Sequence, residues 1–67
     1  MLSARNQLLG VVKSVALGDI MAEVVIQVGE FEIVSAITRG SAEAMGLEVG
    51  DGVRAVIKST EVMVDKT

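Results

Sequence analysis

Residues 49–60, VGDGVRAVIKST, decide the fold, because a turn, a strand and a polar strand end follow one another directly. The glycines of Gly50-Asp51-Gly52 supply the backbone freedom that a sharp turn requires. Val53–Ile57 is predicted as a strand, since valine and isoleucine favour a pleated, half-buried surface. The strand ends on an ammonium and two hydroxyls, which belong to Lys58, Ser59 and Thr60.

A second group of hydrogen-bond donors opens the chain. Ser3-Ala4-Arg5-Asn6 places a hydroxyl, a guanidinium and an amide just before another predicted strand. The planar fork of arginine suits bidentate bonds to oxyanions. If the fold joins this group to Lys58-Ser59-Thr60, within a chain or across two chains, a pocket for a small oxyanion results. Taken alone, the two groups also fit a polar terminus and a solvent-facing strand end.

Composition excludes several classes of protein. The chain has 67 residues, no cysteine, no histidine and one aromatic residue, Phe31, yet 51% of it is hydrophobic. The length predicts a single domain, residues 1–67. The core of a domain below about 70–80 residues rarely contributes more than about 3–5 kcal/mol of stability. Because the chain has more apolar residues than such a core can bury, we expect it to assemble with copies of itself. The absence of cysteine and histidine removes disulfides, thiolate metal sites and the commonest acid-base group. We therefore expect no enzyme, no metal site and no cofactor.

The charge and hydropathy patterns narrow the partners and the location. The net charge of −3 argues against a nucleic-acid partner, which requires a basic surface. No apolar run reaches the roughly 20 residues of a membrane span, and the polar start leaves no room for a signal peptide. The expectation is a cytoplasmic protein with no membrane partner.

The remaining pattern predicts an all-β fold. Gln7–Leu17 is a strand in which Gly10 indicates a bulge or a bend, and both of its faces are mostly apolar. Ile20–Val28 is the second strand, and Gly29-Glu30 links it to the third, Phe31–Thr38. The second strand directs one apolar face into the core, made of Ala22, Val24, Ile26 and Val28.

A short helix interrupts the strands. The helix is predicted to start at Ser41, its N-cap, and to end just before Gly46. A fifth strand is predicted at Glu61–Val64, before a polar tail. Three strands, a helix and two strands is the order of an OB-like five-stranded Greek-key barrel, with the helix between strands 3 and 4. Gly40 and Ser41 at the helix start could hold an anion, or they serve as ordinary capping residues. The glycines at 46, 50 and 52 lack phosphate-loop spacing, which argues against a nucleotide site.

Four segments together resemble the molbindin, or Mop, family of small molybdate-binding proteins. They are SARNQLLGVV (residues 3–12), AEVVI (22–26), LEVGDGV (47–53) and IKST (57–60). The resemblance covers about residues 2–64. It implies a homohexamer built as a trimer of dimers, with molybdate or tungstate held at subunit interfaces for molybdenum storage or homeostasis. Many relatives have Ala-Val-Asn-Ala-Glu where this chain has Asp19-Ile20-Met21-Ala22-Glu23, a departure that affects one class of site.

The resemblance also implies which residues bind. Ser3, Arg5 and Asn6 of one subunit would meet Lys58, Ser59 and Thr60 of a neighbour. A second anion site near the three-fold axis is placed at Gly40 and Ser41.

The residues alone are also compatible with two other classes of function. An OB barrel can bind nucleic acid, although such barrels use stacking aromatic residues and a basic groove, which this chain lacks. A purely structural assembly module is the other.

Overall fold

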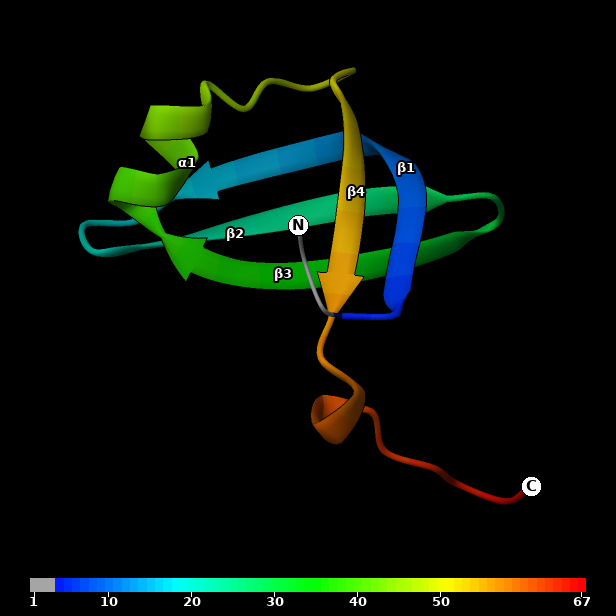
Figure 1. Ribbon diagram of the computed structural model, residues 1–67. Coiled ribbons are helices and arrows are strands. Elements are labelled where there is room, and N and C mark those ends of the chain that lie inside the picture. Colours follow the sequence, from blue (N-terminus) through cyan, green and yellow to red (C-terminus); the bar gives the residue numbers. More distant parts are fainter. Residues whose placement is uncertain (1–3) are drawn as a thin grey trace.

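The computed structural model describes residues 4–67, which form four strands, one α-helix and one 3-10 turn (Figure 1). Each of the first four predicted strands agrees with the observed bounds to within one residue. The elements are β1 (Asn6–Leu17), β2 (Met21–Val28), β3 (Phe31–Thr38), α1 (Arg39–Met45), β4 (Gly52–Ile57) and η1 (Ser59–Glu61). The structure confirms a mostly-β chain with its helix between the third and fourth strands.

The four strands form one antiparallel sheet in the order β3-β2-β1-β4. β1 belongs to both halves of this sheet: its first half pairs with β4 and its second half pairs with β2. The strand changes direction in its middle, so β4 runs across the line of β2 and β3 (Figure 1). This bend wraps the sheet towards the partly open barrel that the element order predicts.

Gly10 lies at the bend of β1, where the chain passes very close to β2. A Cβ atom at this position would lie 2.6 Å from the Gln27 carbonyl oxygen and 2.7 Å from Cγ2 of Ile26. Only a residue without a side chain fits there. The predicted bend is confirmed, whereas the bulge lies further along, between Val12 and Ser14.

The core lies on the inner face of the sheet. Ala22, Val24 and Ile26 of β2 are buried, as predicted, and Val28 packs against the same cluster. Because of the bulge, the core receives both Val12 and Val15 from β1, although strict alternation places them on opposite faces.

The Gly-Asp-Gly turn, residues 50–52, is hydrogen-bonded to β1. The Val12 amide donates to the Asp51 carbonyl oxygen at 2.9 Å, and the Gly50 amide donates to the Val12 carbonyl oxygen at 2.9 Å. Gly50 has φ of +96°, a conformation that favours glycine. The side chain of Asp51 also accepts a bond from the Glu48 amide at 2.9 Å. This turn therefore brings the second half of the chain back to the bend in β1.

The helix begins earlier than the sequence predicts. Thr38, not Ser41, is the N-cap: its Oγ1 accepts from the Ser41 amide at 3.1 Å. The prediction of Ser41 as N-cap is wrong, because Thr38 at the end of β3 already has the extended backbone that a cap needs. Gly46 ends the helix in the left-handed conformation, as predicted.

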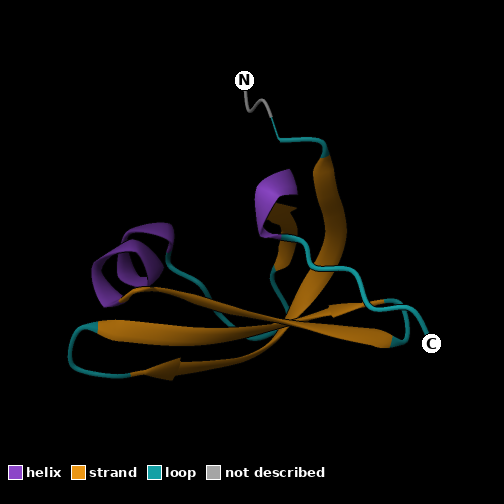
Figure 2. Ribbon diagram, turned by 90° about the horizontal axis from the view of Figure 1, so that it is seen from below, coloured by secondary structure: helices purple, strands orange, loops and turns teal. Residues whose placement is uncertain are grey.

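The predicted fifth strand is not formed within the chain. Glu61 lies in η1, and residues 62–67 have no regular secondary structure. A strand needs a neighbouring edge to pair with, and in Figure 1 the tail runs beyond the end of β4, away from the sheet. Figure 2 shows it as a loop up to the C-terminus. Within residues 4–67, β3 and β4 are consequently the two unpaired edges of a four-stranded sheet. No helix among residues 4–67 is long and apolar enough to cross a membrane.

Candidate functional site

The two donor groups singled out in the sequence meet at one end of the β1–β4 pair. Asn6, the first residue of β1, is paired with Ile57, the last residue of β4. Arg5 immediately precedes this pair and Lys58 immediately follows it, so both lie at the same end of the ladder. Both side chains are exposed, whereas Asn6 is half-buried.

Ser59 and Thr60 continue from Lys58 into the 3-10 turn η1. Both residues are exposed, and the Glu61 amide closes the turn by donating to the Lys58 carbonyl oxygen at 2.9 Å. The turn thereby keeps the two hydroxyl-bearing residues next to the end of β4. Ser3, the first residue of the predicted site, lies outside the described residues.

Two residues that the sequence reasoning missed support the start of β1. The side-chain amide of Gln7 donates to the Ala4 carbonyl oxygen at 2.7 Å. Arg54 of β4 donates from Nη1 to Oε1 of Gln7 at 3.2 Å. This chain of bonds ties the backbone that carries Arg5 to β4, and its guanidinium comes from further along the ladder, where Arg54 is paired with Leu9. The only signal in the sequence is that Arg54 interrupts an otherwise apolar strand.

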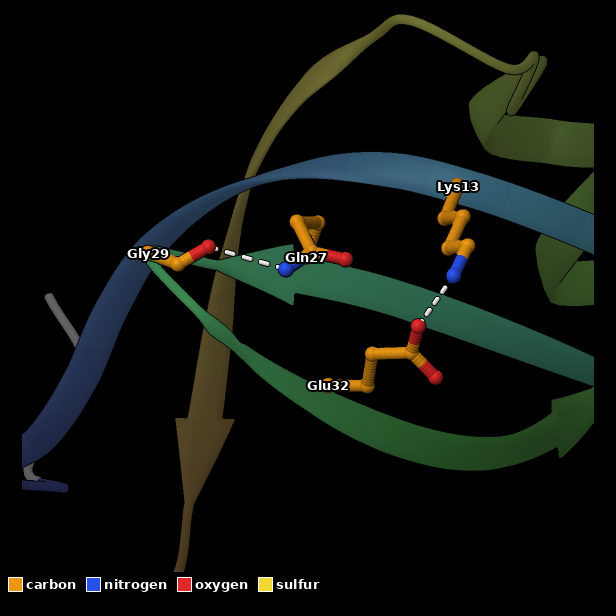
Figure 3. Close-up of polar contacts among 4 residues, drawn as sticks. All are labelled: Lys13, Gln27, Gly29 and Glu32. Atoms are coloured by element: carbon orange, nitrogen blue, oxygen red, sulfur yellow. Dashed lines mark hydrogen bonds and ion pairs between the residues drawn. The ribbon is translucent and has the colours of Figure 1, made fainter.

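The distribution of ion pairs distinguishes these cations from others in the chain. Lys13 of β1 is paired with Glu32 of β3 on the face shown in Figure 3, and Arg39 is paired with Glu43 at 3.5 Å. In the same view Gln27 donates to the carbonyl oxygen of Gly29, so its amide is also engaged. The chain has six lysines and arginines, and within residues 4–67 four have no carboxylate partner: Arg5, Arg54, Lys58 and Lys66.

Three of those four cations lie on or beside the β1–β4 pair, and we call them the cation cluster: Arg5 and Lys58 flank the Asn6–Ile57 end, and Arg54 lies further along β4. Positive charges without carboxylate partners repel one another and favour a bound anion. Arginine and lysine with adjacent hydroxyl and amide donors can form charge-assisted bonds to oxyanions. Arg5, Arg54 and Lys58 are all exposed, and contact with water weakens such bonds.

The helix start is a separate place in the molecule. In Figure 1, α1 lies beside one end of β2 and β3, whereas η1 lies beyond the end of β4. The Ser41 amide and hydroxyl are both engaged by Thr38, at 3.1 and 2.8 Å. Ser41 is therefore engaged by the N-cap Thr38, and anion binding at Gly40 and Ser41 stays a prediction. Among residues 4–67 there is no group of three or more acidic residues placed to hold a metal ion.

These features define a small, mostly-β domain with an OB-like order of strands and a polar, cation-rich end. A family model for the TOBE domain matches residues 2–64, and the chain belongs to the TOBE-domain family. Molybdenum-pterin-binding protein 1 of Clostridium pasteurianum is 47% identical to this chain over 64 residues, which span 94% of each protein.

Two solved structures have the same fold. A molybdate-binding protein from Sporomusa ovata matches with a TM-score of 0.95 at 39% identity, covering 98% of both chains. MopII from Clostridium pasteurianum matches with a TM-score of 0.92 at 42% identity, covering 98% of this chain and 100% of that one. The resemblance to the Mop family is therefore confirmed.

Proposed function

We propose that this chain binds molybdate, and tungstate as its close analogue, at the cation cluster. The observation that carries the proposal is the position of Arg5 and Lys58 on either side of the Asn6–Ile57 pair, with Arg54 bonded to Gln7 further along the same two strands. None of the three has a carboxylate partner in residues 4–67. The names of the relatives from Clostridium pasteurianum and Sporomusa ovata support the same ligand.

The chemistry of the ligand fits the donors present. Molybdate is a tetrahedral dianion, so it needs donors from several directions. Arg5 offers a planar fork and Lys58 a point charge, while Asn6, Ser59 and Thr60 offer an amide and two hydroxyls. The overall charge of −3 does not oppose this, because local donors set the potential at a site.

Exposure of the cluster indicates that a second copy completes it. Bonds to an anion strengthen when water is excluded, and one chain leaves Arg5 and Lys58 exposed. The outer face of the β1–β4 pair is also apolar and exposed, with Leu9 at 72% and Val56 at 42%. Burying this face would stabilise an oligomer. We therefore place the anion at an interface of a homo-oligomer, and the resemblance to the Mop family implies a hexamer built from three dimers.

The role that follows is binding rather than catalysis. The site has no histidine, no cysteine and no recognisable pair of acid-base groups. Reversible capture of an oxyanion in the cytoplasm suits molybdenum storage or homeostasis.

Calorimetric titration with sodium molybdate tests the function directly. Wild type should bind, whereas Arg5→Ala and Lys58→Ala should each weaken binding by about tenfold or more, because a hydrogen bond to a charged group contributes about 1.5–3 kcal/mol. Lys66→Ala is the matched control, since it removes an unpaired cation of the tail. Equal losses in all three variants would show a non-specific charge effect and contradict the assignment.

A further inference from the structure

Arg54 is a cation on an otherwise apolar part of the outer face of the β1–β4 pair. Its cross-strand partner is Leu9, which is 72% exposed, and Val56 follows it on the same face. The guanidinium has no carboxylate partner within residues 4–67. Its Nη1 donates instead to Oε1 of Gln7, a neutral side chain, at 3.2 Å. The bond therefore orients Gln7 without neutralising the charge of Arg54.

The register of the two strands makes this contact possible. Arg54 is paired with Leu9, two residues after Gln7, so Arg54 and Gln7 are diagonal neighbours on one face. Diagonal neighbours lie about 7–8 Å apart, which long side chains can bridge. Arg54 itself stands three residue pairs from the Asn6–Ile57 end, or about 10 Å along the strands. Its connection to that end of the ladder runs through Gln7.

The guanidinium determines which way the Gln7 amide faces. A side-chain amide accepts through its oxygen and donates through its nitrogen. Because a guanidinium can only donate, Oε1 of Gln7 must face Arg54, and Nε2 then faces the Ala4 carbonyl oxygen, to which it donates at 2.7 Å. A side chain without a donor at position 54 would leave the amide free to turn. Arg54 thus selects the orientation of Gln7 that holds the backbone just before Arg5.

We propose that Arg54 is a positioning residue of the anion site and that it acts on Arg5 only through Gln7. This inference rests on the proposed function, in which Arg5 and Lys58 supply the charged donors. Ala4 and Gln7 are both half-buried, so the bond between them is less weakened by water than an exposed bond. A segment that is ordered before the anion arrives loses less conformational entropy on binding, which raises affinity without a further contact to the ligand.

Nuclear magnetic resonance relaxation tests the positioning without any ligand. Backbone order parameters are about 0.85 where the chain is rigid and fall below about 0.6 where it is flexible. Those of Ala4 and Arg5 should fall in Arg54→Met and in Gln7→Leu. They should stay near the wild-type values in Arg54→Lys, since an ammonium can also donate to the Gln7 oxygen. Lys66→Met is the matched control, because it exchanges the same charge for the same side chain in the polar tail. Unchanged order parameters in Arg54→Met would overturn the positioning role.

A double-mutant cycle of molybdate affinity tests whether Arg54 acts only through Gln7. Arg54→Met and Gln7→Leu should each weaken binding in calorimetry by about two- to tenfold, the range for one typical hydrogen bond. The double variant should bind no more weakly than Gln7→Leu alone, because the second substitution removes nothing further. Losses that multiply in the double variant would show that Arg54 acts on the anion by its own charge, and would refute the inference.

The two measurements also separate this inference from the proposed function. If the order parameters change as described but wild type does not bind molybdate, the proposed function fails and the positioning of Arg5 stands. If wild type binds molybdate and the order parameters are the same in all variants, the positioning role fails and the proposed function stands.

Discussion

Asn6 is paired with Ile57 at the open end of the β1–β4 ladder, and this pairing brings together two polar segments about fifty residues apart in the sequence. Arg5 on one side and Lys58 on the other lie next to this pair. The end of the ladder is therefore rich in positive charge.

Arg5→Ala should remove most of the stabilisation that molybdate confers on the folded protein. A ligand that binds only the folded state raises its stability by about 2.7 kcal/mol per site at a concentration about 100 times Kd. Without ligand the substitution should be nearly neutral, because it also removes repulsion from Lys58. Melting temperatures with and without millimolar molybdate measure both effects. Arg5→Lys should give an intermediate shift, since it keeps the charge and loses the fork. A wild-type shift in Arg5→Ala would make Arg5 an ordinary surface residue.

Gln7→Leu should weaken molybdate binding without removing any ligand-binding charge. The substitution breaks the bonds that join Arg54, Gln7 and the Ala4 carbonyl oxygen. A typical net hydrogen bond contributes about 0.5–1.5 kcal/mol, so affinity should fall by about two- to tenfold in calorimetry. Gln27→Leu is the control, because its bond to Gly29 lies elsewhere on the sheet. Unchanged affinity in Gln7→Leu would show that this network does not position Arg5.

Gly10→Ala should destabilise the fold by about 1–3 kcal/mol, the usual range for overpacking. The new Cβ atom would lie 2.6 Å from the backbone oxygen of Gln27, which cannot move without disturbing the β1–β2 ladder. Gly40→Ala is the opposite case: nothing lies within 4 Å of its added Cβ, and alanine suits a helix better. Urea unfolding of both variants measures the difference. Equal stability of the two would contradict the close approach at the bend.

Thr38→Ala should destabilise the protein by about 1 kcal/mol through loss of the helix cap. Its Oγ1 accepts from the Ser41 amide, so molybdate stoichiometry should stay unchanged if Ser41 serves only in capping. Thermal unfolding and titration of the same variant separate the two roles. A lower stoichiometry in Thr38→Ala or Ser41→Ala would instead identify a second anion site at the helix start.

Tungstate should compete with molybdate about equally, and sulfate should bind more weakly. A site of fixed donors discriminates between anions by size and charge, and sulfate is the smaller anion. Competitive calorimetric titration of the three sodium salts gives the ratios. Sulfate binding as tight as molybdate binding would show that the donors relax inward around any dianion.

Local patterns in the sequence are sufficient to predict most elements of this fold. Alternating apolar residues and Gly-Asp or Gly-Glu turns locate β2 and β3, because side chains alternate strictly between the faces of a strand. The core face of β2 follows from the same alternation. The donor groups around Arg5 and Lys58 are also recognisable by residue type alone.

Tertiary structure decides what depends on distant partners. The register of Asn6 with Ile57 joins the two donor groups, and no local pattern specifies a pairing across fifty intervening residues. The bulge after Val12 redirects Val15 into the core, since one extra residue reverses the alternation that follows it. The strand predicted at Glu61–Val64 has the right side chains, but within residues 4–67 it pairs with no strand of its own chain. Composition determines that a segment favours a strand, whereas hydrogen bonding to a neighbour decides whether the strand forms.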